Sequence, residues 1–111
     1  MLKVYGIKNC DTVKKVLNFL DQNQIEYEFI DFKKNAPTKE ELLMWKKSFG
    51  DWPVNKRGRT YKMISDEFES GSDAQKIKIL QDKTSSIKRP ITTNGKDFSF
   101  GFDQSELQKF I

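Results

Sequence analysis

The order of apolar stretches in the first 32 residues constrains the fold most strongly. Leu2, Val4 and Tyr5 form a short apolar stretch that ends at Gly6, a pattern typical of a buried strand. An amphipathic stretch follows, whose apolar residues recur at helical spacing: Val13, Val16, Leu17 and Leu20. Aromatic and β-branched residues over 27–32 predict a second strand. A strand, a helix and a strand in this order form a βαβ unit with parallel strands and a right-handed crossover.

The middle of the chain, about residues 38–83, is predicted to be almost entirely helical. Thr38 and Glu41 have the spacing of a capping box ahead of an apolar stretch, and Gly50 suits the end of that helix. Two further helical stretches are expected, one or two turns over 61–68 and a helix capped by Asp73. This segment therefore reads as a helical insertion in an α/β core.

Extended structure is predicted to resume at Ile87–Ile91. Asn94-Gly95 is a strong hairpin signal, with 97–100 as the partner strand, and Asp103 is expected to cap a closing helix. The order β-α-β, helices, β-β-α is that of an α/β thioredoxin-like fold with a mixed sheet. A chain of 111 residues is the size of one ordinary domain, so residues 1–111 are expected to form a single domain.

Cys10 lies where the first strand turns into the first helix, and it is the only cysteine. The first N–H groups of a helix have no partner within the helix, and the helix dipole adds positive charge there. A thiolate is favoured at such a position, where the thiol pKa falls below its usual value near ~8.5. The alternative is that Cys10 is a small apolar residue of the core, the commoner role of a free cysteine.

The composition excludes several function classes. The chain has no histidine and one cysteine, which excludes Ser-His-Asp catalysis, Cys-His catalysis, a zinc site of Cys and His ligands and an internal disulfide. No Ca²⁺ loop or phosphate-binding glycine loop is present, so no metal and no bound cofactor are expected.

Charge and hydropathy bear on partners and location. The net charge of +4 is modest, and basic and acidic residues alternate along most of the chain, which does not favour a nucleic-acid binder. The cluster Lys56-Arg57-Gly58-Arg59 is either a solvated loop or an anion-binding arm. No apolar run approaches ~20 residues and no signal sequence is evident, so a cytoplasmic protein without a membrane partner is expected.

Three motifs resemble the arsenate reductase/Spx-like family, especially its YffB-, Spx- and MgsR-type members. They are Tyr5-Gly6-Ile7-Lys8-Asn9-Cys10-Asp11-Thr12, Asn55-Lys56-Arg57-Gly58 and Ile87-Lys88-Arg89-Pro90-Ile91. The resemblance runs in the same order over essentially the whole chain.

The resemblance implies a site built around Cys10. In glutaredoxin-coupled arsenate reductases of this family, one cysteine attacks arsenate, and three arginines hold the oxyanion and lower the thiol pKa. Arg57 and Arg89 are similar to the first two, and Pro90 stands where the fold keeps a cis proline. The third position falls at residues 100–102, where this chain has no arginine. This departure weakens the oxyanion site that the resemblance implies, and a small thiol or an oxyanion is expected as substrate.

The leading hypothesis is a thiol-dependent reductase in which Cys10 is the nucleophile. Arg57 and Arg89 would bind the substrate together with Asn9 and Thr12, and an external thiol, glutathione or glutaredoxin, would be the reductant. The neighbouring carboxylate of Asp11 opposes ionisation of the thiol.

The alternative is a non-enzymatic Spx-like regulator that binds the C-terminal domain of the RNA polymerase α subunit. Val13 stands where Spx-type members have the second cysteine of a Cys-x-x-Cys switch, so no such switch can form. Trp45, Phe49 and Trp52 either face a partner or pack the interior. A monomer is expected under both hypotheses.

Overall fold

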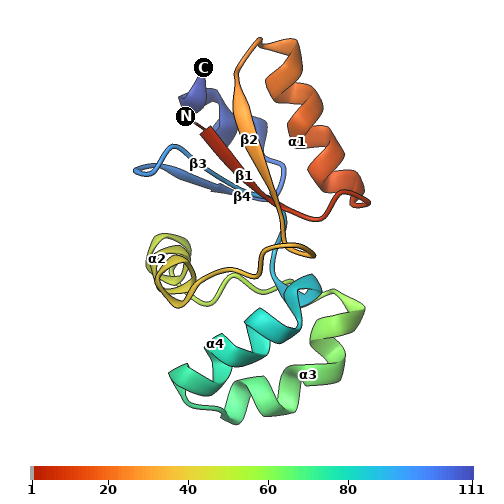
Figure 1. The fold of residues 1–111 in the computed structure, drawn as a ribbon, viewed down its shortest axis with the longest axis vertical. Helices are drawn as coiled ribbons and strands as arrows, with labels where there is room; N and C mark the ends of the chain where they lie inside the picture. Colours follow the sequence, from red (N-terminus) through yellow and green to blue (C-terminus); the bar gives the residue numbers. More distant parts are fainter. Residues whose placement is uncertain (1) are drawn as a thin grey trace. The chain divides into compact units, whose positions relative to one another are not determined.

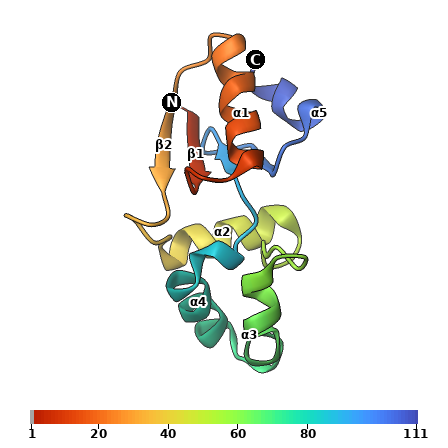
Figure 2. The same ribbon diagram turned by 90° about the vertical axis from the view of Figure 1, so that its right-hand side faces the viewer.

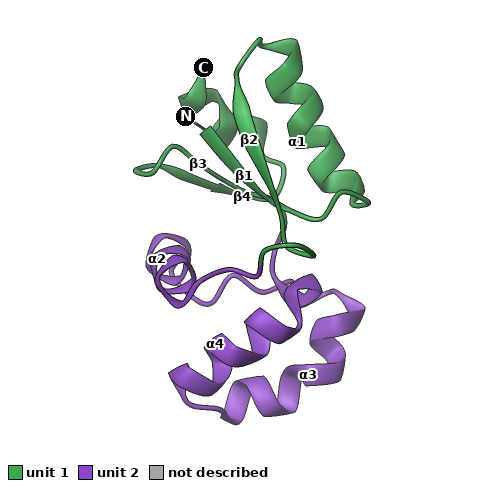
Figure 3. Cartoon of the chain, viewed as in Figure 1, with its two compact units in different colours: residues 1–35, 89–111 green, residues 36–88 purple. Residues whose placement is uncertain are grey.

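The computed structural model describes residues 2–111 (Figure 1). Its elements are β1 (Leu2–Gly6), α1 (Asp11–Gln22), β2 (Tyr27–Asp31), α2 (Lys39–Phe49), α3 (Arg59–Ser70), α4 (Asp73–Asp82), β3 (Ile91–Thr93), β4 (Phe98–Phe100) and α5 (Gln104–Leu107). Short 3₁₀ turns follow α4 at Thr84–Ser86 and α5 at Gln108–Phe110. The chain divides into two compact units (Figure 3). The first unit consists of the chain up to Asn35 together with Arg89–Ile111, and the second unit is Ala36–Lys88.

The first unit holds a four-stranded mixed sheet in the order β2-β1-β3-β4. β1 and β2 are parallel, as the βαβ pattern predicts, while β3 runs antiparallel to both β1 and β4. Val4 in the centre of β1 lies opposite Phe29 on one side and Thr92 on the other. The predicted α/β thioredoxin-like fold is confirmed.

Helices α1 and α5 pack on one face of this sheet (Figure 2). The buried residues of this core come from β1, α1 and α5: Leu2, Val4, Val16, Phe19, Leu20 and Leu107. The apolar stripe of α1 thus meets the strand that precedes it in sequence. Burying these side chains stabilises the βαβ unit and fixes the direction in which α1 leaves β1.

Local signals define most ends of the elements. Thr38 and Glu41 form the predicted capping box, since Thr38 Oγ1 accepts from the Glu41 N–H at 3.1 Å and Glu41 Oε1 from the Thr38 N–H at 2.9 Å. Gly50 ends α2 with φ +90°, a left-handed conformation that glycine adopts without strain.

Two predicted helix features in the second unit were wrong in detail. α3 is a full helix of 12 residues rather than one or two turns. α4 is capped by Ser72 and not by Asp73, which is its first helical residue. The reason is a second capping box, in which the Ser72 hydroxyl accepts from the Gln75 N–H and Gln75 Oε1 accepts from the Ser72 N–H.

The predicted hairpin joins β3 and β4. Asn94 Oδ1 accepts from the N–H groups of Lys96 and Asp97, at 2.9 and 2.8 Å, and Gly95 takes φ +95°. The Gly95 N–H donates to Thr93 Oγ1 at 2.9 Å. β3 begins at Ile91, later than predicted, because Ile87 pairs instead with Val54 in an isolated bridge of the second unit.

The second unit contains α2, α3 and α4 and encloses the predicted insertion of about 38–83. Trp45 and Trp52 are only 1% and 4% exposed, so both side chains are buried. Trp52 meets the edge of Phe68 at 6.3 Å between ring centroids, and Lys46 lies 4.7 Å from the Trp52 ring centroid. No helix within residues 2–111 has the length and apolar character that crossing a membrane requires.

Strand β4 forms one edge of the sheet, and Lys109 lies against it. The Lys109 ammonium donates to the carbonyl oxygen of Phe98 and forms an ion pair with Glu106 at 2.8 Å. A charged side chain therefore occupies an outward-facing hydrogen-bonding position of the edge strand.

Candidate active site

Cys10 occupies the N-cap position of α1, at the end of the turn that follows β1. Its backbone is extended, with φ −115° and ψ 124°, and its carbonyl oxygen accepts the N–H of Lys14 at 3.0 Å. The side chain is half-buried. The sulfur is therefore held at the start of the helix and remains partly accessible to a reactant.

Opposing effects act on the Cys10 thiol. Partial burial alone raises its pKa, because it disfavours the charged form. The N–H of Val13, the guanidinium of Arg89, through both a hydrogen bond and its charge, and the N–H of Thr12 lower the pKa. Together these donors outweigh burial, so the pKa of Cys10 lies below its ordinary value.

Arg89 reaches the sulfur from the segment that enters β3. It is half-buried, and the Arg89–Pro90 peptide bond that follows is cis. Folding thus brings two residues 79 positions apart in the sequence into contact, and the sheet that pairs β1 with β3 is what unites them.

Gly6 permits the close packing around this site, a role that the sequence did not reveal. A Cβ placed on Gly6 would lie 3.0 Å from Val13 Cγ2 and 3.6 Å from Pro90 Cβ. The contact with Pro90 would be an ordinary one, whereas the contact with Val13 would be tight. The end of β1 and the first turn of α1 therefore pack this closely because residue 6 has no side chain. The only signal in the sequence is a glycine at the end of a strand, which also suits a simple turn.

The other predicted site residues lie in the turn before α1, in the first turn of α1 or in the second unit. Asn9 is exposed in the turn, Thr12 contributes its backbone N–H, and Asp11 is exposed as the first residue of α1. Arg57 belongs to the second unit, where it is exposed in the turn before α3. The structure therefore unites Cys10 with Arg89, and the role of Arg57 at the thiol stays a prediction.

Arg57 lines a cavity of about 320 Å³ within the second unit, which we call the basic cavity. Its lining residues are Phe49, Asp51, Trp52, Val54, Asn55, Lys56, Arg57 and Lys88. The basic cavity combines cationic side chains with two aromatic rings.

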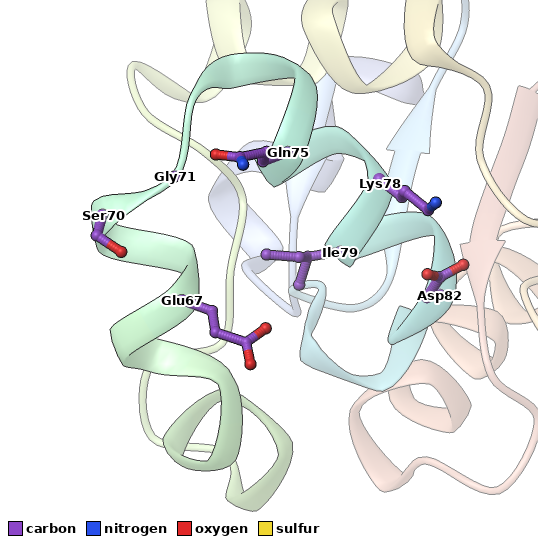
Figure 4. Close-up of a pocket in the computed structure, with 7 residues that line it drawn as sticks. All are labelled: Glu67, Ser70, Gly71, Gln75, Lys78, Ile79 and Asp82. Carbon is purple, nitrogen blue, oxygen red and sulfur yellow. The ribbon is translucent and has the colours of Figure 1, made fainter.

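A cavity of about 550 Å³ lies between α3 and α4 (Figure 4). Figure 4 shows Glu67 of α3 and Ile79 of α4 directed toward each other across it, with Lys78 and Asp82 along α4. None of the predicted site residues lines this cavity. Within residues 2–111 no group of three or more His, Cys, Asp or Glu side chains is placed to hold a metal ion.

The geometry around Cys10 suits nucleophilic chemistry at sulfur or at an oxyanion. A thiolate is the reactive form of cysteine, and the donors that lower its pKa also stabilise it as a leaving group. The helix N–H groups and the Arg89 guanidinium can equally hold an anionic reactant beside the sulfur.

Residues 5–110 match the sequence profile of the ArsC family. The chain is 34% identical over 110 residues to an uncharacterized protein of Haemophilus influenzae, covering 97% of this chain and 96% of that protein. It is 25% identical over 114 residues to the global transcriptional regulator Spx 2 of Bacillus anthracis, covering 100% and 87%. The solved structure of a protein named YFFB superposes with a TM-score of 0.88 at 29% identity, covering 99% and 98%. The chain therefore belongs to the ArsC family, as its three motifs predict.

Proposed function

We propose that this protein is a thiol-dependent reductase in which Cys10 is the nucleophile. The observation that supports the proposal is the set of donors on one half-buried sulfur: the guanidinium of Arg89 and the N–H groups of Val13 and Thr12. Sequences and structures of the ArsC family support a thiol reductase at the level of the family.

The proposed reaction proceeds through a mixed disulfide with the substrate. The Cys10 thiolate attacks one sulfur of a small disulfide, a new S–S bond forms, and the other half of the substrate leaves as a thiolate. An external thiolate, for which we propose glutathione or a glutaredoxin, then attacks the substrate-derived sulfur of the mixed disulfide. Cys10 leaves as a thiolate, and the second half of the substrate is now joined to the external reductant as a disulfide. A second external thiolate attacks the reductant sulfur of that disulfide and releases the remaining half of the substrate as a thiolate, so two external thiols have supplied the two electrons and end as a disulfide.

The single cysteine dictates the second half of this cycle. No other thiol in the 111 residues can resolve the mixed disulfide, so a second molecule has to do so. Arg89 acts in both halves, because it favours the thiolate as nucleophile and later as leaving group.

An oxyanion substrate is the second possibility for the same site. Family members that reduce arsenate hold it with three arginines, and this chain has no arginine at residues 100–102. We therefore propose a small disulfide rather than arsenate as the substrate class.

The reductase proposal is tested by turnover with glutathione and bis(2-hydroxyethyl) disulfide, using Cys10→Ser as the control. The wild type should reduce the disulfide faster than the control and should carry one thiol-reversible adduct on Cys10 by mass spectrometry. Equal rates of disulfide reduction by the wild type and Cys10→Ser would refute the proposal.

A second candidate function is that of a regulator acting through the RNA polymerase α subunit. It is favoured by the similarity to Spx 2 and to the regulatory protein MgsR of Bacillus subtilis, 26% identical over 97% of this chain and 88% of that protein. Val13 replaces the second cysteine of the Spx switch, so binding would not depend on an internal disulfide. Titration of the wild type with the α C-terminal domain tests this candidate, and absence of binding in both oxidising and reducing buffer would exclude it.

A further inference from the structure

The charges of the basic cavity are strongly unbalanced. Lys56, Arg57 and Lys88 face a single carboxylate, that of Asp51. Asp51 Oδ1 already accepts the N–H of Trp52 at 2.8 Å. Within residues 2–111, none of the three cations has a carboxylate within ion-pair distance. The cavity therefore attracts anions.

The apolar wall of the basic cavity has buried residues and one exposed ring. Trp52 and Val54 are buried and form a fixed wall, while Phe49, the last residue of α2, is 40% exposed. A ligand that reaches the cations can therefore bury an apolar group against Phe49 and gain contact area as well as charge pairing.

Lysine side chains lie over both aromatic rings of the cavity, which affects the anionic ligands that can bind there. Lys88 lies 6.0 Å from the ring centroid of Phe49, and Lys46 lies 4.7 Å from that of Trp52. A nucleobase that stacked on either ring would have to displace a cation from the ring face. A peptide side chain that packs against the 40% exposed Phe49 without stacking on its face would leave both lysines in place.

The size of the cavity also favours a small part of a larger partner. Its volume of about 320 Å³ is at the lower end of ligand pockets, which span about 300–1,000 Å³. A single bulky side chain fits, with its neighbours outside among the cations.

We propose that the basic cavity binds a segment of a partner protein in which carboxylates flank one bulky apolar side chain. The apolar side chain packs on Phe49 and Val54, and the flanking carboxylates pair with Lys56, Arg57 and Lys88. This binding site lies wholly in the second unit, and the inference does not rest on the chemistry of Cys10.

The test is a titration of the ¹⁵N-labelled full chain with the acetylated and amidated peptide Asp-Glu-Phe-Glu-Asp. Backbone signals of Phe49, Val54 and Lys88 should shift and saturate, and added salt should weaken binding because the pairs are partly screened. The peptide Asn-Gln-Phe-Gln-Asn replaces every carboxylate by an amide, and the peptide Asp-Glu-Ala-Glu-Asp lacks the bulky apolar side chain. Each should bind about tenfold more weakly than the acidic peptide. Equal binding by either comparison peptide would overturn the proposal, as would tighter binding of AMP with shifts at the same residues.

Paired variants separate a specific site from general attraction. The double variant Lys56→Gln/Lys88→Gln should bind the acidic peptide about tenfold more weakly, and Phe49→Ala should also weaken binding. The matched control Lys78→Gln/Lys83→Gln removes two exposed lysines of the same unit that lie outside the cavity, and it should bind as the wild type does. An equal loss in both double variants would show only nonspecific attraction and would refute the site. Cys10→Ser should retain binding, which keeps this result separate from that of the reductase assay.

Discussion

Replacing Arg89 with glutamine should reduce the population of the Cys10 thiolate at neutral pH. Glutamine can still donate a hydrogen bond, but it carries no charge. The variant therefore isolates the electrostatic contribution of the guanidinium to the sulfur and leaves the N–H groups of Val13 and Thr12 in place.

The expected size of the effect follows from the hydrogen bond and its exposure. A hydrogen bond to a charged group contributes about 1.5–3 kcal/mol and a neutral one about 0.5–1.5 kcal/mol. Both Arg89 and Cys10 are half-buried, so screening by solvent limits the difference to about 1.4 kcal/mol. This corresponds to about tenfold less thiolate at a pH below both pKa values. The remaining thiolate is about threefold more nucleophilic because it is more basic, so alkylation should be about threefold slower.

The assay is the rate of iodoacetamide alkylation of Cys10 as a function of pH. The midpoint of the profile should move to higher pH in Arg89→Gln, and Arg89→Lys should restore part of the shift. Lys14→Gln, which removes an exposed charge from α1, is the matched control and should leave the midpoint in place. An unchanged midpoint in Arg89→Gln, with its thermal stability retained, would refute the assignment of Arg89 to the thiol.

Three further predictions concern Arg57, two threonines and the pH dependence of stability. If Arg57 serves the thiol, Arg57→Gln should slow alkylation of Cys10 by about twofold or more at neutral pH, whereas Arg59→Gln, in the same basic stretch, should not. Equal alkylation rates in the wild type and Arg57→Gln would show that Arg57 does not act on the thiol. Thr92 Oγ1 is buried without a hydrogen-bond partner in the described chain, so Thr92→Val should raise the free energy of unfolding by about 1 kcal/mol in urea denaturation. Thr93→Val should lower it, because Thr93 Oγ1 accepts the N–H of Gly95; the same sign for both variants would contradict this reasoning. Because the pKa of Cys10 is lower in the folded than in the unfolded chain, its thiolate stabilises the fold fully above the unfolded value of about 8.5, and this contribution is lost as the pH falls through the folded pKa. The stability of the wild type relative to Cys10→Ser should therefore be greater at about pH 9 than at about pH 6, and the reverse order would show that burial dominates.

Features of the fold that depend on a few neighbouring residues could be predicted from the sequence. The capping box of Thr38 and Glu41, the left-handed end of α2 at Gly50 and the Asn94-Gly95 hairpin are all confirmed. Asp73 was wrongly chosen as a cap because Ser72 also fits, and only the partner Gln75 decides between them. Ser72 and Gln75 have the same capping-box spacing as Thr38 and Glu41, so this cap could have been predicted from the sequence.

The candidate site was harder to predict, because its parts are distant in sequence. The position of Cys10 at the start of α1 follows from the apolar stripe of that helix. The contact with Arg89 follows from the pairing of β1 with β3, which no local pattern around either residue encodes. Only the family resemblance connected the two residues in advance. The part played by Gly6 could not be predicted, since the missing Cβ matters only once Val13 is placed beside it.

The contact between Lys109 and Phe98 bears on how the sheet meets other molecules. A second chain that extended the sheet beyond β4 would have to bond the carbonyl oxygen that the Lys109 ammonium already holds. It would also have to remove that cation from its carboxylate partner, Glu106. The charged side chain of Lys109 therefore opposes the pairing of another strand, including one from a second copy of this chain, with the free edge of β4.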